Sequence, residues 1–167
     1  GGHDFLHMGM TSRDLTDNVE QLQIRKAGRL TLGKYVSVLR HLLDKADEYR
    51  NIEMVARTHH QAAQPTLLGR RFAMWAEELY THLAEFEAYL DSYPFRGIKG
   101  VVGTQFDMAN LLGSSEKASL LEEKVAQSLG FTETLDAPGQ VYPRSMDFKL
   151  TGHLSALASA CESFAKT

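Results

Sequence analysis

The proline-free stretch from Thr16 to Gln64 constrains the fold of this chain more than any other feature of its sequence. Apolar residues recur along it at steps of mostly three, four or seven, which is the spacing of one face of a helix. These residues are Leu15, Val19, Leu22, Ala27, Leu30, Val36, Leu39, Leu43 and Ala46. We therefore predict one helix from Ser12 to about Arg50, with Ser12 as its N-cap and Asp14 in its first turn. At ~1.5 Å per residue this helix would be about 55 Å long, which exceeds the diameter of a compact domain of this size.

A second helix is predicted between Pro65 and Pro94. Its apolar residues step by 4, 3, 4, 4, 3 and 4 positions, a heptad-like pattern. They are Leu68, Phe72, Trp75, Leu79, Leu83, Phe86 and Leu90. Pro65 suits the first turn of this helix, and Pro94 ends it near Ser92. The glycine-rich segment Gly97–Gln105 follows, and we predict a loop there because its backbone must bend sharply or approach another group closely.

Two further helices complete the predicted fold. The first runs from Ser114 to about Leu129, with Ser114 or Ser115 as its cap and Gly130 at its end. The second begins at Arg144, after a loop, and continues to the last residues. Since no convincing pair of strands is found, we predict an all-α fold, an elongated bundle of long helices. Helices of this length need partners to bury their apolar seams, so we expect the chain to self-associate.

Composition and charge exclude several classes of protein. The 167 residues carry 18 Lys and Arg against 21 Asp and Glu, a net charge of −3, which excludes a strongly basic nucleic-acid-binding protein. The single cysteine, Cys161, excludes an internal disulfide framework and a cysteine-rich zinc site. No apolar run approaches the ~20 residues that span a bilayer, and no signal peptide opens the sequence. We therefore expect a soluble, cytoplasmic protein that binds neither membrane nor nucleic acid.

Polar residues gather at the start of the first predicted helix, in the segment His7–Asp14. Thr11 and Ser12 would place two hydroxyl groups beside unpaired backbone N–H groups, at the positive end of the helix dipole. This arrangement can hold a carboxylate or a phosphate group. An ordinary helix cap is the alternative interpretation.

A second polar segment, Arg57–Thr66, contains the adjacent histidines His59 and His60. Imidazole is the side chain best suited to proton transfer near neutral pH, so we expect a general acid or base here. A polar surface loop is the alternative. A metal site is not expected, because His3 and His7 have the spacing of a metal-binding pair but lack a third ligand.

The third segment with polar chemistry is the glycine-rich loop Gly97–Gln105. Its glycines would allow backbone N–H groups to face a ligand, and Gln105 could bond an amide or a carboxylate. A loop without a ligand is again the alternative.

These segments, in this order and joined by long helices, resemble the adenylosuccinate lyases of the fumarase/aspartase superfamily. Four motifs carry the resemblance, which extends over essentially the whole chain. They are His7-x-Gly-x-Thr11-Ser12-x-Asp14, Thr58-His59-x-Gln61-x-Ala63-Gln64-Pro65-Thr66, Gly97-x-Lys99-Gly100-x-x-Gly103-Thr104-Gln105 and Gly139-Gln140-x-Tyr142-x-Arg144. Four motifs in one order are far more specific than any one of them.

The resemblance implies a β-elimination that removes fumarate from adenylosuccinate, leaving AMP, and from the related succinyl-carboxamide ribotide of purine biosynthesis. It implies that His59 is the general acid toward the leaving nitrogen. It assigns the other residues to substrate binding: a carboxylate at Thr11 and Ser12, the succinyl end at Thr58 and Gln105, and support of the pocket by His7. No metal or organic cofactor is implied, since proton transfer and hydrogen bonding suffice for this reaction.

The resemblance also places residues 1–167 in the central helical domain of such an enzyme. We therefore expect the N-terminal region, the catalytic serine loop and the C-terminal domain to lie outside this sequence, and this part alone to be inactive. Members of the family are homotetramers, which implies a homotetramer with a small purine-nucleotide substrate. Two alternatives stay open: another lyase of the superfamily, of the argininosuccinate lyase or carboxymuconate cycloisomerase type, and a non-catalytic helical oligomerisation module.

Overall fold

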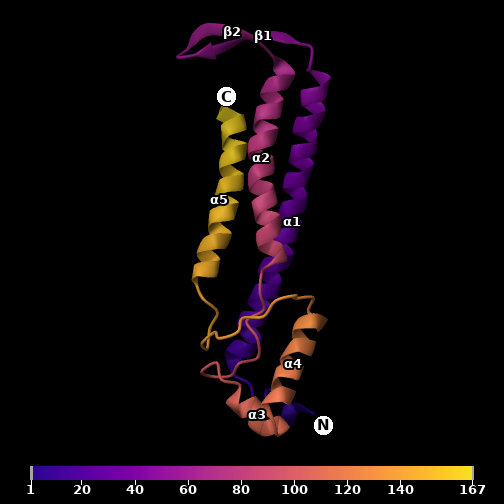
Figure 1. The fold of residues 1–167 in the computed structure, drawn as a ribbon, viewed down its shortest axis with the longest axis vertical. Helices are drawn as coiled ribbons and strands as arrows, with labels where there is room; N and C mark the ends of the chain where they lie inside the picture. Colours follow the sequence, from indigo (N-terminus) through magenta and orange to yellow (C-terminus); the bar gives the residue numbers. More distant parts are fainter. Residues whose placement is uncertain (1, 167) are drawn as a thin grey trace. The chain divides into compact units, whose positions relative to one another are not determined.

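The computed structural model describes residues 2–166, which form two compact units (Figure 1). The first unit comprises the residues up to Gly28 together with Tyr89–Phe148. The second comprises Arg29–Ala88 together with the residues from Lys149 onward. The helices that contribute to both units are α1 (Ser12–Glu48), α2 (Leu68–Asp91) and α5 (Ser145–Lys166). The predicted predominance of long helices is therefore confirmed.

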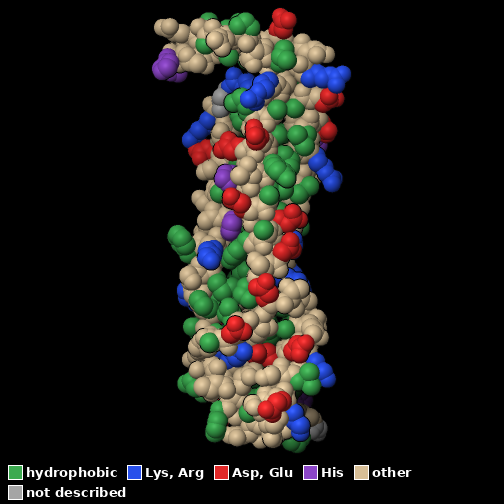
Figure 2. Space-filling model, viewed as in Figure 1, with side chains coloured by type: hydrophobic (Ala, Val, Ile, Leu, Met, Phe, Trp, Pro, Cys, Tyr) green, Lys and Arg blue, Asp and Glu red, His purple; other side chains and the backbone are tan. Residues whose placement is uncertain are grey.

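The second unit is built on the segments of α1, α2 and α5 that lie side by side in Figure 1. The predicted seam of α2 is buried from Leu79 onward, with Leu79 and Leu83 only 2% and 6% exposed and Phe86 not exposed at all. Aromatic rings extend the packing, because Trp75 contacts the rings of Phe72 and Phe164 edge to face. Other large hydrophobic side chains of this unit stay exposed, as Figure 2 shows along its helices. They include Leu30, Val38, Leu43, Met74 and Tyr80.

A two-stranded antiparallel hairpin joins α1 to α2, which corrects the prediction that the chain contains no strand pair. Its strands are β1 (Glu53–Thr58) and β2 (Gln61–Leu67), with a register shift between Val55 and Arg57. Pro65 lies in β2 rather than in the first turn of α2, which begins only at Leu68. Both strands of a two-stranded ribbon are edges, so a residue without an N–H group is tolerated there. The short strands lack the apolar alternation that would have indicated them in the sequence.

Gly69 allows the start of α2 to approach the end of α1. The backbone N–H groups of Leu68 and Gly69 donate to the carbonyl oxygens of Ile52 and Tyr49, at 2.8 and 2.9 Å. A Cβ atom on Gly69 would collide with the carbonyl oxygen of Ala46 and would lie 2.7 Å from the Cα of Arg50. The N-terminal turn of α2 is thus satisfied by the backbone that leaves α1, and only glycine fits at this junction.

The first unit packs two short helices, α3 (Phe106–Leu112) and α4 (Ser115–Ser128), against the start of α1 and two loops. Its buried hydrophobic cluster consists of Tyr93, Phe95, Ile98, Met108, Ala118, Ala126 and Phe131.

The predicted cap of α4 is confirmed, because the Ser114 hydroxyl accepts a hydrogen bond from the N–H of Lys117 at 3.2 Å. The sequence did not predict α3, whose seven residues are too few to show a helical period. A short 3₁₀ helix, His3–Phe5, precedes α1. None of the described helices is long and apolar enough to cross a membrane.

Candidate functional site

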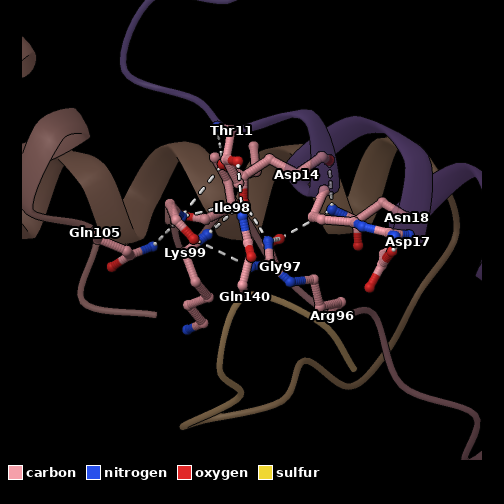
Figure 3. A network of polar contacts seen from close by, with 12 residues as sticks. Thr11, Asp14, Asp17, Asn18, Arg96, Gly97, Ile98, Lys99, Gln105 and Gln140 are labelled. Carbon is pink, nitrogen blue, oxygen red and sulfur yellow. Dashed lines mark hydrogen bonds and ion pairs between the residues drawn. The ribbon is translucent and has the colours of Figure 1, made fainter. Parts of the chain in front are cut away.

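The carboxylate of Asp14, in the first turn of α1, organises the polar part of the first unit (Figure 3). It is buried and accepts hydrogen bonds from the backbone N–H groups of Thr11 at 2.8 Å, Lys99 at 3.0 Å and Gly100 at 3.1 Å. It also contacts the guanidinium group of Arg96. A single carboxylate therefore fixes both the cap of α1 and the turn of the glycine-rich loop.

Arg96 joins this arrangement from the loop side and is not exposed to solvent. Besides Asp14, its guanidinium group donates to the carbonyl oxygens of Gly97 and Gly100, each at 3.2 Å, and of Gly139 at 3.0 Å. Its backbone N–H donates to the side-chain oxygen of Gln21 at 2.7 Å. Three segments that are distant in sequence, the start of α1, the Gly97–Gln105 loop and the loop before α5, thus meet at one side chain.

Asp17 and Asn18, one turn further along α1, strengthen the same junction. Asp17 is buried and accepts a hydrogen bond from the backbone N–H of Tyr142 at 3.1 Å. The side-chain amide of Asn18 donates to the backbone carbonyl oxygens of Asp14 at 2.8 Å and Gly97 at 2.9 Å. The first, third and fourth motifs of the sequence are therefore assembled in one unit by buried polar contacts.

Glu122 of α4 holds the other side of the glycine-rich loop. Its carboxylate contacts the Lys99 ammonium at 2.6 Å, the Ile98 backbone N–H at 2.7 Å and the side-chain amide nitrogen of Gln105 at 3.0 Å. The Gln105 amide also donates to the Ile98 carbonyl oxygen at 3.1 Å, so both of its N–H bonds are engaged. Gly97, with φ of +96°, permits this approach, because a Cβ atom there would collide with the Glu122 carboxylate. Gln105 can offer a ligand only its amide oxygen while it stays in this arrangement.

The structure places the three other predicted site residues of the first unit near the start of α1. Thr11 is buried, and its hydroxyl oxygen accepts a hydrogen bond from the side-chain amide of Gln140 at 3.4 Å. Ser12 is exposed and is already the first helical residue, so Thr11 rather than Ser12 occupies the cap position. His7 is exposed, with a positive φ of 75°. Of these residues, Thr11 is the one tied directly into the buried polar contacts.

Thr58 and His59 belong to the second unit and lie at the tip of the hairpin. Both are exposed, and the two-residue turn that follows Thr58 consists of His59 and His60. The turn has positive φ values of 49° and 61° at these histidines. Hairpin turns with this backbone favour Asn-Gly, so two consecutive histidines are an energetically unfavourable choice. Such backbone strain is typical of residues retained for function rather than for stability.

Sequence reasoning missed most of the buried polar residues of the first unit. Asp14 was noted only as a first-turn acid, and no role was predicted for Asp17, Asn18, Gln21, Arg96 or Glu122. One signal was available: Asp14, Asp17, Asn18 and Gln21 recur at i, i+3, i+4 and i+7, which places them on one face of α1. Their partners, by contrast, follow from tertiary contacts about 75 to 125 positions away, which no local pattern contains.

The described residues contain no group of three or more His, Cys, Asp or Glu side chains that could hold a metal ion. The buried charged groups of the first unit take part in ion pairs instead. Arg96 contacts Asp14, and Lys99 contacts Glu122. The chemistry that this unit offers is therefore hydrogen bonding from backbone N–H groups and hydroxyls.

Comparison with known proteins agrees with this architecture. The sequence model of a family described as lyase matches residues 2–165. The adenylosuccinate lyase of Saccharomyces cerevisiae is 35% identical over 96% of this chain and 33% of its own length. That of Schistosoma mansoni is 34% identical over 92% of this chain and 32% of its own length.

The fold itself matches a solved structure. The fumarate lyase from Mesorhizobium sp. BNC1 superposes with a TM-score of 0.79 at 22% identity, covering 98% of this chain and 37% of that one. The chain spans about a third of the length of the curated relatives it matches.

Proposed function

The chain belongs to the lyase family of the fumarase/aspartase superfamily, and we propose that it is the central part of an adenylosuccinate lyase. The complete protein would remove fumarate from adenylosuccinate, leaving AMP, and from the succinyl-carboxamide ribotide of purine biosynthesis. The observation that carries this proposal is the similarity to curated adenylosuccinate lyases along nearly the whole chain. The assembly of three of the four motifs around Asp14 and Arg96 supports it.

The reaction requires two kinds of group, and the chain offers candidates for both. A proton must reach the leaving nitrogen as the carbon–nitrogen bond breaks, and His59 is the proposed donor. His59 lies at an exposed turn, so its imidazole is accessible to a substrate bound outside the hairpin. The positive φ at His59 also supports a functional role, because such backbone strain is typical of functional residues. Charge that develops on the succinyl carboxylates must be stabilised, and Thr11, Ser12 and Thr58 are the proposed hydrogen-bond donors, with His7 supporting the pocket.

Gln105 has a restricted part in this proposal. Both N–H bonds of its amide are used by Glu122 and Ile98, so its free oxygen can only accept a hydrogen bond. To donate to a carboxylate of the succinyl group, the amide must leave Glu122. We therefore assign Gln105 to the succinyl end on the condition that substrate replaces Glu122 as its partner.

Self-association is part of the proposal. The second unit exposes the side chains of Leu30, Val38, Leu43, Met74 and Tyr80, which a monomer would leave in contact with water. Burying them between copies of the chain is favourable by about 25 cal/mol per Å² of apolar surface. A homotetramer of the complete protein is expected, and light scattering that finds a monomer at high concentration would contradict it.

An activity assay of the complete purified protein tests the substrate. We expect adenylosuccinate to be converted to AMP and fumarate, followed by ultraviolet absorbance and by chromatography of the products. Argininosuccinate and carboxymuconate serve as comparison substrates, and turnover of either in preference to adenylosuccinate would move the protein to another lyase of the superfamily. Absence of turnover with every substrate would favour a helical oligomerisation module.

A further inference from the structure

We propose that a cavity at the base of the hairpin in the second unit binds a small phosphoryl-bearing anion through Arg57, Arg70 and Arg71. The cavity has a volume of about 270 Å³, and Thr66, Met74 and Trp75 also line it. Figure 2 shows Lys and Arg side chains gathered beneath the hairpin. None of these three arginines has a role in the proposed elimination, so the inference does not rest on the proposed function.

The groups around this cavity are matched to an anion in both charge and hydrogen bonding. Three guanidinium groups line it, and none of the described lining residues is Asp or Glu. Guanidinium groups stay charged at any physiological pH and present planar pairs of donors that match phosphate oxygens. A multiply charged phosphoryl group can accept several charge-assisted hydrogen bonds from such donors at once. Pyrophosphate, with its several oxygen acceptors, fits this donor set.

The floor of the cavity is held in place before any ligand binds. The guanidinium group of Arg71 stacks over the ring of Trp75, 5.3 Å from its centroid. Trp75 is in turn packed edge to face against Phe72 and Phe164, with centroids 5.4 and 5.0 Å away. Little side-chain entropy remains to be lost at Arg71 when an anion binds, which favours affinity. Arg57 and Arg70 are exposed, and the Arg57 guanidinium group donates a hydrogen bond of 3.5 Å to the carbonyl oxygen of His60.

The lining residues come from three elements. Arg57 belongs to β1, Thr66 to β2, and Arg70 and Arg71 to the first turn of α2. An anion that contacts all of them would tie both strands to the helix. Binding should therefore slow the opening of the hairpin as well as occupy the cavity.

Hydrogen–deuterium exchange of the complete protein with and without inorganic pyrophosphate tests this inference, because it locates the binding. We expect slower exchange in residues 53–75. The double variant R57Q/R70Q should weaken pyrophosphate binding, measured by titration calorimetry, by at least about tenfold, since it removes two charge-assisted contacts. Both replaced side chains are exposed, and an unchanged melting temperature would verify that the variant folds.

The variant K34Q/R40Q is the matched control. It removes the same two charges from exposed positions of α1 that do not line the cavity. Protection of residues 53–75 that is lost in R57Q/R70Q and kept in K34Q/R40Q would support the site. Protection that survives in R57Q/R70Q, or no protection in the unmodified protein, would overturn it. Equal protection by citrate at the same concentration would overturn the preference for a phosphoryl group.

Discussion

Arg96 and Asp14, which lie 82 positions apart in the sequence, form an ion pair in which neither side chain is exposed to solvent. The pair joins the start of α1 to the glycine-rich loop. Backbone N–H groups of that loop also donate hydrogen bonds to the Asp14 carboxylate. A buried pair of this kind adds little stability over apolar side chains of the same size, yet breaking it leaves a buried charge without its partner. The geometry of the loop therefore depends on both members being present.

Replacing Arg96 by Met should lower the free energy of unfolding by about 3–5 kcal/mol, because Asp14 then stays buried and charged without its partner. Urea denaturation measures the loss. Arg50→Met is the control, since Arg50 and its partner Asp47 are 68% and 76% exposed and such a pair contributes about 0–1 kcal/mol. Equal effects of the two substitutions would show that the buried pair is unimportant.

Glu122→Gln should be strongly destabilising, whereas Glu123→Gln should be nearly neutral. Glu122→Gln removes the counter-charge of the Lys99 ammonium group, whose side chain is only 11% exposed. This should lower the free energy of unfolding by about 3–5 kcal/mol. The neighbouring Glu123 is exposed and accepts a hydrogen bond from Gln127, so its loss costs within about 0.5 kcal/mol. Thermal unfolding of both variants provides the comparison, and similar melting temperatures would contradict the importance of the Lys99 contact.

The helices could be predicted from the sequence because their signals are local. The bounds of α1 and α2 differ from the predicted ones by a few residues, and the cap of α4 at Ser114 lies where the sequence placed it. Apolar spacing and helix caps depend on residues within a few positions of each other, so one sequence contains them. The hairpin was missed because its strands are mostly exposed and show no apolar alternation, and because the proline in β2 resembles the start of a helix.

The candidate site could be predicted only in part, for a different reason. Motifs identified Thr11, His59 and Gln105, but not what holds them. The partners of Gln105, for example, are Glu122 and Ile98, and only folding brings α4 to the loop. The sequence predicts that Gln105 can bond an amide or a carboxylate, but it does not indicate that these two neighbours use both of its donors. Long-range polar contacts such as these decide which atoms of a motif remain available to a substrate.

Three tyrosines, of which Tyr93 and Tyr142 are buried and Tyr89 is half-buried, should make the first unit sensitive to alkaline pH. Burial raises the pKa of Tyr89 to about 12, and burial also raises the pKa values of Tyr93 and Tyr142 above the ordinary value of 10.0. The unfolded chain releases these protons near pH 10, while the folded chain retains them, so stability present below pH 10 is lost as the pH rises toward 12. Urea denaturation over this pH range measures the slope.

Phenylalanine variants separate the contributions of two of these tyrosines. Among the described residues the Tyr93 hydroxyl has no hydrogen-bond partner, so Tyr93→Phe should be neutral or stabilising at neutral pH and should reduce the alkaline slope. Tyr142→Phe removes a hydrogen bond of 2.9 Å to the Asp147 carboxylate and should cost about 1.5–3 kcal/mol. A larger loss for Tyr93→Phe than for Tyr142→Phe would contradict this assignment.

Alanine substitutions at two glycines should have opposite effects. Gly69→Ala places a Cβ atom against the backbone of α1, 2.7 Å from the Cα of Arg50, and should cost about 1–3 kcal/mol. Gly33→Ala, inside α1, meets no atom within 4 Å and should stabilise the helix by about 1 kcal/mol. Melting temperatures of the two variants decide the question, and a stabilising Gly69→Ala would mean that α1 and α2 are not in contact at this junction.

His59→Asn in the complete protein should lower turnover of adenylosuccinate by about 10²–10⁴, which is the usual contribution of a general acid. Asparagine is the appropriate replacement because it tolerates the positive φ of this turn better than most residues, so the hairpin keeps its backbone while the imidazole is lost. His60→Asn makes the same change at the next residue, whose φ of 61° is also positive, and should leave turnover close to that of the unmodified protein. If the substitutions acted through the backbone of the turn, both variants would lose activity equally. If His59 is the proton donor, only His59→Asn loses activity. Retained turnover in His59→Asn would remove His59 from the reaction, and loss of turnover in His60→Asn alone would transfer the role to its neighbour.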